Sequence, residues 1–307
     1  MSPDRFAVTI EGRDVELSNL DKLMYPAAGF TKGEVIDYYT RVAPVMLPHL
    51  SGRAATRIRY PNGVEGAHFF EKNKPAGTPD WVRLETLPVP GSTKSRETIE
   101  FVVVDDLPTL VWVANLASIE LHTPQWRVGA DPDLMVVDLD PGAPAGLKEC
   151  CAVAVLMRDR LADDGIAAYP KTSGKKGMQL CCPISGTRSA EVVSSYAKKV
   201  AEELAAMVPG SITAKMAKAV RPGKVFIDWS QNAAAKTTVT PYSLRAGERP
   251  TASTPLTWDE VIAMATGEAE ARQFGPDEVL ARVEQHGDLL ADLLRNGNVV
   301  PEADRRK

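Results

Sequence analysis

The sequence predicts a mixed α+β fold. Some segments have apolar residues at helical spacing and others are rich in strand-forming residues, and the two kinds do not alternate strictly as in a doubly wound parallel sheet. The 307 residues suffice for one large domain or two intimately joined lobes. The chain has 44% hydrophobic and 25% charged residues, which excludes a disordered chain, a coiled coil and a collagen.

Helices are predicted from caps and from apolar spacing. Thr31 and Glu34 form a capping box at the start of the first helix. Gly165 is a suitable residue just beyond the end of the third helix. Thr257 and Glu260 form a second capping box, which begins an acidic helical segment. The four helices before that segment are expected at residues 31–47, 107–118, 146–164 and 189–207.

Strands are predicted between these helices, in short segments rich in β-favouring residues. They are expected at residues 57–60, 100–104, 134–140, 167–171, 178–183 and 225–229. The four cysteines form two adjacent pairs, Cys150–Cys151 and Cys181–Cys182, whose spacing is neither that of a zinc site nor that of a disulfide scaffold. We therefore expect buried, reduced thiols.

The sequence shows no export or membrane signal. Its first residues lack the apolar stretch of a secretory signal, and no run of about 18 apolar residues could cross a bilayer. We therefore expect a cytoplasmic, nucleoid-associated protein without a membrane partner.

The net charge of −4 is unevenly distributed along the chain. Residues 258–304 hold eleven acids and three bases, whereas elsewhere the bases occur in clusters. A single cluster is usually a solvated basic surface. Three clusters beside candidate metal carboxylates favour a polyanion site. The clusters are Arg53, Arg57 and Arg59; Lys171, Lys175 and Lys176; and Lys215, Lys218, Arg221 and Lys224.

The strongest local motif is a pair of aspartates at the end of an apolar strand. Asp138 and Asp140 are two residues apart, so their carboxylates share one face of the strand, and Pro141-Gly142 then turns the chain. Two like charges this close repel unless a cation neutralises them, and hard oxygen ligands suit Mg²⁺ or Mn²⁺. Two exposed acids at a strand end are the alternative.

Asp228 is a third acid of the same character, since it ends another apolar strand. With Asp138 and Asp140 it could hold two ions that clamp the attacking and leaving oxygens of a phosphoryl transfer. Pairing with a nearby lysine or arginine is the alternative for Asp228.

Other segments carry weaker signals. The Gly- and Lys-rich residues 171–177 could cradle a phosphate or form a basic hairpin loop. The donors that follow Asp228 suggest contacts to a triphosphate or a sugar. Phe69-Phe70 could stack on a base or belong to the core. His122 follows a predicted helix and is by default a structural histidine. The donors after Asp228 are Gln231, Asn232, Lys236 and Arg245.

Together these segments resemble the polymerase domain of bacterial ATP-dependent DNA ligase D, a member of the archaeo-eukaryotic primase superfamily. The resemblance covers roughly residues 15–295 and rests on eight motifs in the family's order. They begin at Asn19 (NLDKLMYP), Arg57 (RIRYPNG), Phe69 (FFEK), Glu120 (ELHTPQW), Val137 (VDLDPG), Ser173 (SGKKG), Lys224 (KVFIDWSQN) and Pro241 (PYSLR).

The resemblance implies a primase-polymerase fold, with two mixed or antiparallel sheets flanked by helices and an active-site cleft between them. We accordingly expect a single domain over residues 1–307. Within it we expect an N-terminal DNA-end-binding lobe at about 1–105, a catalytic lobe at about 106–255 and an acidic helical segment at about 256–300.

The resemblance also implies residue roles. Asp138, Asp140 and Asp228 would bind the catalytic metals. Asn19, Lys22 and Lys32 would grip a 5′-phosphate of the DNA, and Phe69 and Phe70 would stack on the template. The incoming nucleotide would be bound by His122 near its sugar and by Ser173, Lys176, Gln179, Arg221, Gln231, Asn232, Lys236 and Arg245.

One position departs from the family pattern. Gln179 stands where the family has a histidine on the strand after the glycine loop. If Gln179 faces the nucleotide, its amide can donate a hydrogen bond to a phosphate but cannot become cationic, which predicts weakened rather than lost polymerisation.

The implied activity is template-dependent nucleotidyl transfer by a DNA polymerase or primase. It would use two Mn²⁺ or Mg²⁺ ions, prefer ribonucleotides over deoxyribonucleotides, and fill gaps or extend ends in non-homologous end joining. The sequence has no Lys-x-Asp-Gly adenylation segment, so we expect a stand-alone polymerase working with a separate DNA ligase and a Ku-type end-binding protein. The alternatives are a catalytically weak protein that bridges DNA ends and a metal phosphohydrolase.

Overall fold

The computed structural model describes residues 5–89, 97–295 and 297–302, and it confirms the α+β class. The chain forms two compact units, each built from several stretches of sequence. The first comprises Met1–Pro124, Val239–Ala252 and Gly275–Gly287. The second comprises Gln125–Thr238, Ser253–Phe274 and Asp288–Lys307.

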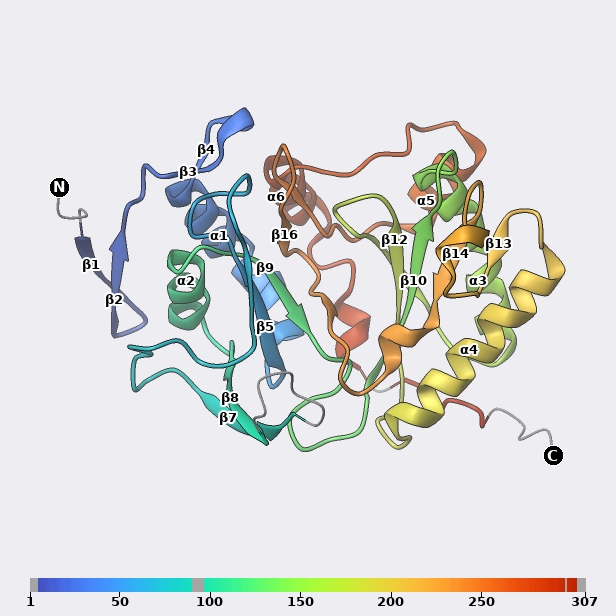
Figure 1. The fold of residues 1–307 in the computed structure, drawn as a ribbon, viewed down its shortest axis with the longest axis horizontal. Coiled ribbons are helices and arrows are strands. Elements are labelled where there is room, and N and C mark those ends of the chain that lie inside the picture. The colour runs from blue at the N-terminus through green and yellow to red at the C-terminus, as the bar shows by residue number, and fades with distance from the viewer. Residues whose placement is uncertain (1–4, 90–96, 296, 303–307) are drawn as a thin grey trace. The chain divides into compact units, whose positions relative to one another are not determined.

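The first unit is built around a sheet in which β9, β5, β8 and β7 lie in that order (Figure 1). The strand β6 is also paired to β5. The strand β15 (Thr238–Val239), where the chain returns to this unit, follows beside β9. The other strands are β5 (Ala54–Arg59), β6 (Phe69–Glu71), β7 (Leu84–Pro88), β8 (Thr98–Val103) and β9 (Ser118–Thr123).

Helices and small hairpins complete the first unit. The helices α1 (Lys32–Leu50) and α2 (Leu107–Asn115) pack together, and α6 (Pro276–His286) packs on α1. Tyr38 and Tyr39 of α1 are buried and donate hydrogen bonds to backbone carbonyls. The antiparallel pairs are β1 (Arg5–Ile10) with β2 (Arg13–Ser18), β3 (Leu23–Tyr25) with β4 (Phe30–Thr31), and β16 (Leu244–Arg245) with β17 (Thr251–Ala252).

The second unit is a five-stranded sheet in the order β11-β12-β10-β14-β13, antiparallel except for the β13–β14 pair. The helix α3 packs on β10 and α5, and α4 packs against the short helix η3 (Trp229–Asn232). The strands are β10 (Leu134–Pro141), β11 (Tyr169–Thr172), β12 (Met178–Pro183), β13 (Ile212–Thr213) and β14 (Val225–Asp228). The helices are α3 (Leu147–Asp163), α4 (Ala190–Met207) and α5 (Trp258–Thr266).

The local signals in the sequence located α1 to α5 and four strands of the second unit's sheet, but they missed most strands of the first unit. Both capping boxes form, at Thr31 with Glu34 and at Thr257 with Glu260. Gly165 adopts the left-handed conformation just after α3. The four cysteines are buried and free, as predicted. No helix in the described part of the chain is long and apolar enough to span a membrane.

Two expectations about organisation need correction. The helix predicted at 107–118 ends at Asn115, because Ala117 takes a positive φ of 60° and the chain reverses into β9. His122 therefore lies within a strand. The predicted lobes also differ from the observed compact units: β9 completes the first unit's sheet, so that unit extends to Pro124 rather than to about 105. The acidic segment contributes to both units.

Candidate metal and nucleotide sites

Strand register brings three aspartates to one face of the second unit's sheet. Asp138 on β10 lies opposite Asp228 on β14, and directly opposed residues of antiparallel strands project to the same side. Asp140 is two residues beyond Asp138 and so shares that face. The predicted grouping of these three carboxylates at one end of the sheet is therefore present.

The carboxylates interact strongly with one another. Burial and the charge of Asp140 raise the pKa of Asp138 to about 7. Burial and the charge of Asp228 likewise raise the pKa of Asp140, while Arg221 opposes that rise. Such repulsion is what a bound dication relieves, and carboxylate oxygens are ligands that Mg²⁺ and Mn²⁺ prefer. The donor chemistry therefore fits a divalent ion.

The side-chain geometry of these acids is not that of a closed metal cage. In the part of the chain that the structure describes, no three His, Cys, Asp or Glu side chains are arranged to hold a metal ion. Asp228 accepts hydrogen bonds at Oδ1 from the Ser230 hydroxyl at 2.6 Å and at Oδ2 from Gln231 Nε2 at 2.9 Å. A metal ion bound by the Asp228 carboxylate would therefore share its oxygens with the Ser230 and Gln231 donors. Among the described residues, no lysine or arginine forms an ion pair with Asp228.

Gln179 contacts this acidic face directly. Its Nε2 donates to Asp138 Oδ1 at 3.0 Å, and its Oε1 accepts from Lys171 Nζ at 2.6 Å. The sequence interpretation had the Gln179 amide donating to a phosphate, whereas the structure directs it to a carboxylate. Lys171 is only 1% exposed and so is not part of a basic surface, contrary to its place in the second cluster.

The loop between β11 and β12 is a tight basic hairpin. Ser173 N donates to the Gly177 carbonyl, and the Gln273 amide bridges Gly174 N and that same carbonyl. A Cβ at Gly177 would lie 2.0 Å from the Leu139 carbonyl oxygen, so only glycine allows the loop to pack on β10. Lys175 and Lys176 remain exposed at the turn.

The donors that follow Asp228 serve different purposes. Asn232 is 2% exposed, and its side chain bonds both N–H and C=O of Val136, so it fastens η3 to β10. Its predicted nucleotide contact is therefore corrected to a structural one, because its amide is already satisfied by backbone. Lys236 is exposed. Arg221 stacks over the Phe226 ring and donates to the Met216 carbonyl.

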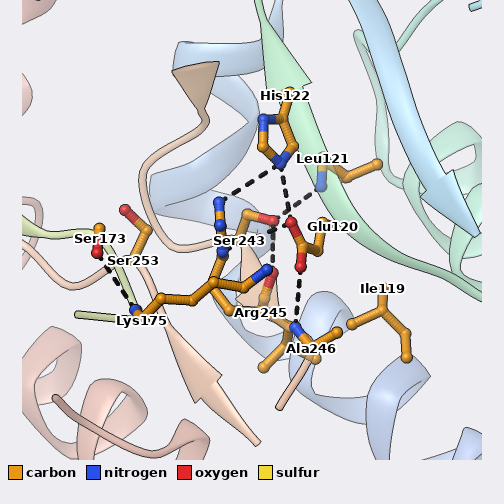
Figure 2. Close-up of polar contacts among 12 residues, drawn as sticks. Ile119, Glu120, Leu121, His122, Ser173, Lys175, Ser243, Arg245, Ala246 and Ser253 are labelled. Carbon is orange, nitrogen blue, oxygen red and sulfur yellow. Dashed lines mark hydrogen bonds and ion pairs between the residues drawn. The ribbon is translucent and has the colours of Figure 1, made fainter. Parts of the chain in front are cut away.

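A second polar cluster lies in the first unit, on β9 and β16 (Figure 2). Glu120 is buried and accepts hydrogen bonds from His122 Nε2 at 3.0 Å and from Ala246 N at 3.0 Å. Arg245 Nε lies 3.5 Å from Glu120 Oε2, and Arg245 Nη1 lies 3.5 Å from His122 Nε2. Glu120 therefore orients two of the predicted nucleotide-binding residues.

The predicted 5′-phosphate residues form a cationic group in the first unit. The Lys32 ammonium donates to the Ser18 carbonyl at 2.5 Å, and Lys22 Nζ donates to Asn62 Oδ1 at 3.2 Å. Burial, Lys22 and Arg59 lower the pKa of Lys32 to about 8. Asn19 holds a left-handed φ of 53° in the adjoining loop. Lys32 is only 4% exposed, whereas Lys22 is exposed. Positive charges that repel one another at the edge of the buried interior are suited to an anion.

Two arginines of the first basic cluster, Arg53 and Arg57, are not on the surface. Arg53 is 5% exposed, and Arg57 is fully buried on β5. The Arg57 guanidinium donates to the Asn73 carbonyl at 2.6 Å. The cluster therefore offers DNA only Arg59, which is partly buried and pairs with Glu71 at 2.8 Å.

The Phe69–Phe70 pair is exposed rather than in the core. The two residues are 53% and 68% exposed. The centroid of the His68 ring is 5.2 Å from that of Tyr60 and 6.1 Å from that of Phe70. Such exposed rings suit stacking on a base.

Two residues of these clusters, Glu120 and Lys171, were given no individual role from the sequence. Each is buried and charged, which costs energy unless a partner is present. A charged residue at an inward position of a strand pattern is the signal that could have identified them.

Comparison with known proteins establishes the fold as that of primase-polymerases. A solved structure, the polymerase domain from Mycobacterium tuberculosis ligase D in complex with DNA, matches with a TM-score of 0.85 and 40% identity. The match covers 92% of this chain and 98% of that chain.

This chain belongs to the LigD primase-polymerase family, whose model, described as "LigD, primase-polymerase domain", matches residues 31–290. The multifunctional non-homologous end joining protein LigD of Mycolicibacterium smegmatis is 43% identical over 91% of this chain, and the bifunctional non-homologous end joining protein LigD of Bacillus subtilis is 33% identical over 92%. The matched region spans 36% and 44% of those proteins. The family inferred from the eight motifs is thus confirmed.

Proposed function

We propose that this chain is a template-dependent nucleotidyltransferase that adds nucleotides, ribonucleotides in preference, to DNA ends or gaps during non-homologous end joining. The observation that carries the proposal is the row of Asp138, Asp140 and Asp228 on one sheet face. The family and the DNA-bound structural neighbour support it. In this proposal a DNA ligase seals the product and a Ku-type protein captures the ends.

The three aspartates would hold two Mn²⁺ or Mg²⁺ ions. Bound there, such ions supply Lewis-acid stabilisation of the oxygens that attack and leave in nucleotidyl transfer. The protein's own part is to fix the acids in register and to supply positive charge for the triphosphate from Arg221, Lys176 and Lys236. Positioning and charge stabilisation then carry most of the catalysis.

A gapped duplex with a 5′-phosphate, incubated with Mn²⁺ and labelled nucleotides, tests the proposal. Template-directed extension, faster with ribonucleotides than with deoxyribonucleotides, is the expected result. A gel shift without extension would instead indicate an end-bridging protein, which the exposed Phe69–Phe70 pair and the cationic group would also suit. Shortening of the DNA would indicate a phosphohydrolase.

Glu120→Gln is expected to raise the nucleotide KM about tenfold or more. The neutral amide cannot form an ion pair with Arg245. Its N–H₂ group would also face a group, such as Ala246 N, from which the Glu120 carboxylate now accepts a hydrogen bond. KM measured at a gapped duplex checks this, and thermal melting reports whether the variant folds. Glu284→Gln, an exposed acid on α6, is the matched control. An unchanged KM would show that His122 and Arg245 do not contact the nucleotide.

The preference for a 5′-phosphorylated end is expected to decline about tenfold between pH 7 and pH 9. Lys32, whose pKa is about 8, is charged below that pH and loses its proton above it, whereas the terminal phosphate stays ionised throughout. Binding of phosphorylated and unphosphorylated duplexes across this range is the measurement. Lys32→Arg, which stays charged, should keep the preference and flatten its pH dependence; an equal slope in that variant would contradict the assignment.

A further inference from the structure

A row of polar residues crosses four strands of the second unit's sheet. Lys171 on β11 is the register partner of Gln179 on β12, Gln179 is the partner of Asp138 on β10, and Asp138 is the partner of Asp228 on β14. Three of these strands, β12, β10 and β14, are labelled in Figure 1. Directly opposed residues share a face, so the row runs from a cation to the proposed metal ligands.

We propose that Lys171 is a positioning residue that acts through Gln179 to hold the Asp138 carboxylate in the orientation needed for the metal. This inference rests on the proposed function, since it concerns the same acidic face. Neither Lys171 nor Gln179 contacts the reacting atoms in this scheme. Each acts on Asp138, which would hold the metal.

The contacts fix the direction of hydrogen bonding from Lys171 through Gln179 to Asp138, which we call the relay. Lys171 Nζ donates to Gln179 Oε1 at 2.6 Å, and Gln179 Nε2 donates to Asp138 Oδ1 at 3.0 Å. An ammonium can only donate and an ionised carboxylate can only accept, so the Gln179 amide has one orientation that satisfies both neighbours. Lys171 thereby determines which end of the amide faces the aspartate.

Burial makes this arrangement rigid. Lys171 is 1% exposed and Gln179 is 5% exposed. The Lys171 ammonium is also anchored by the Ser253 hydroxyl, which is 2.7 Å away and fully buried. Residues that hydrogen-bond to a metal ligand fix its orientation, and their loss typically weakens metal binding or activity by about 10- to 100-fold.

The relay also explains how a glutamine can serve at this position. Its side chain does what the row requires, because it accepts from a lysine and donates to a carboxylate at the same time. A histidine introduced here could replace the glutamine only as a neutral ring, with one nitrogen donating to Asp138 and the other accepting from Lys171. A protonated histidine would instead direct an N–H and a positive charge at the Lys171 ammonium.

The test is a double-mutant cycle in the full chain, with Gln179→Met, Lys171→Met and the double variant. Mn²⁺ binding to the metal-free protein is measured directly by titration, and kcat and nucleotide KM are measured on the gapped duplex. Gln179→Met is expected to weaken Mn²⁺ binding about tenfold and to lower kcat about tenfold, with nucleotide KM within about twofold. In the Lys171→Met background, Gln179→Met should change either quantity by less than about twofold.

Two further variants complete the design. Lys171→Arg keeps a buried donor facing Gln179 and should restore part of the activity lost in Lys171→Met. Ser253→Ala removes an anchor of Lys171 but leaves the path to Asp138, so it should weaken Mn²⁺ binding less than Lys171→Met does; a larger loss would contradict the proposed path. Thermal melting separates loss of fold from loss of positioning.

Several outcomes would overturn the inference. Equal effects of Gln179→Met in both backgrounds would make Lys171 a purely structural residue. A raised nucleotide KM with unchanged kcat would move Gln179 to the triphosphate, and unchanged Mn²⁺ affinity in Gln179→Met would remove the relay. If the wild-type chain fails to extend DNA, the proposed function fails, while the Mn²⁺ titrations still decide the relay.

Discussion

Replacing Asp138 or Asp140 with asparagine is expected to lower primer extension about 10³-fold or more, while DNA binding persists or tightens slightly. Each substitution keeps the side-chain volume but removes a charge from the acidic face, and metal stabilisation of the transition state is worth several kcal/mol. Affinity for DNA depends instead on basic residues such as Lys22 and Lys32, and loss of an acid lessens repulsion of the phosphate backbone. Single-turnover extension and a gel shift on the same gapped duplex measure the two effects.

The same substitutions should stabilise the metal-free protein. Burial and the repulsion among Asp138, Asp140 and Asp228 raise the pKa of the first two, so removing one of these charges is expected to raise the free energy of unfolding, more for Asp138 than for the exposed Asp140. Melting in a chelating buffer detects this. Asp163→Asn, an exposed acid near the end of α3, is the control. Extension near the wild-type rate by either variant would refute the metal assignment.

Removing Lys22 and Lys32 together is expected to erase the preference for a 5′-phosphorylated over a 5′-hydroxyl end. Each charge-assisted contact to a partly desolvated phosphate contributes about 1.5–3 kcal/mol. The Lys22→Ala/Lys32→Ala variant should therefore lose a preference of a hundredfold or more, which corresponds to about 3 kcal/mol. The wild-type preference should itself weaken as salt rises.

A control with the same change of charge separates this site from the general field of the protein. Lys148→Ala with Arg295→Ala removes two exposed cations from the second unit. It should weaken binding to both kinds of end equally. If Lys22→Ala/Lys32→Ala behaved in the same way, the phosphate would bind elsewhere, and Arg59 would be the next candidate.

Short-range patterns were enough to locate most helices, the central strands of the second unit and the acids. A capping box such as Thr31 with Glu34 is formed by residues within one helical turn, so the sequence contains all its parts. The same holds for Asp138 and Asp140, because alternation along one strand puts them on one face. The order of eight motifs was sufficient to indicate the family.

Contacts between segments that are distant in the sequence could not be predicted from local patterns. Nothing local shows that Lys171 is buried beside Gln179, that Asn232 is used to bond Val136, or that Glu120 pairs with Arg245. The pairing register of β11, β12, β10 and β14 decides the first of these, and the packing of η3 on β10 decides the second. Register depends on the whole hydrophobic face of a sheet rather than on any one strand.

The sequence by itself therefore determined the α+β class, the family and the pair of acids, Asp138 and Asp140, on one face of a strand. The tertiary structure decided which charged residues are exposed to a ligand and which are buried among their partners. The physical reason is that the burial of a charge is set by neighbours supplied from other strands. Gln179 shows the difference: the motif order identified its position after the glycine loop, but only strand pairing placed its amide between a lysine and an aspartate.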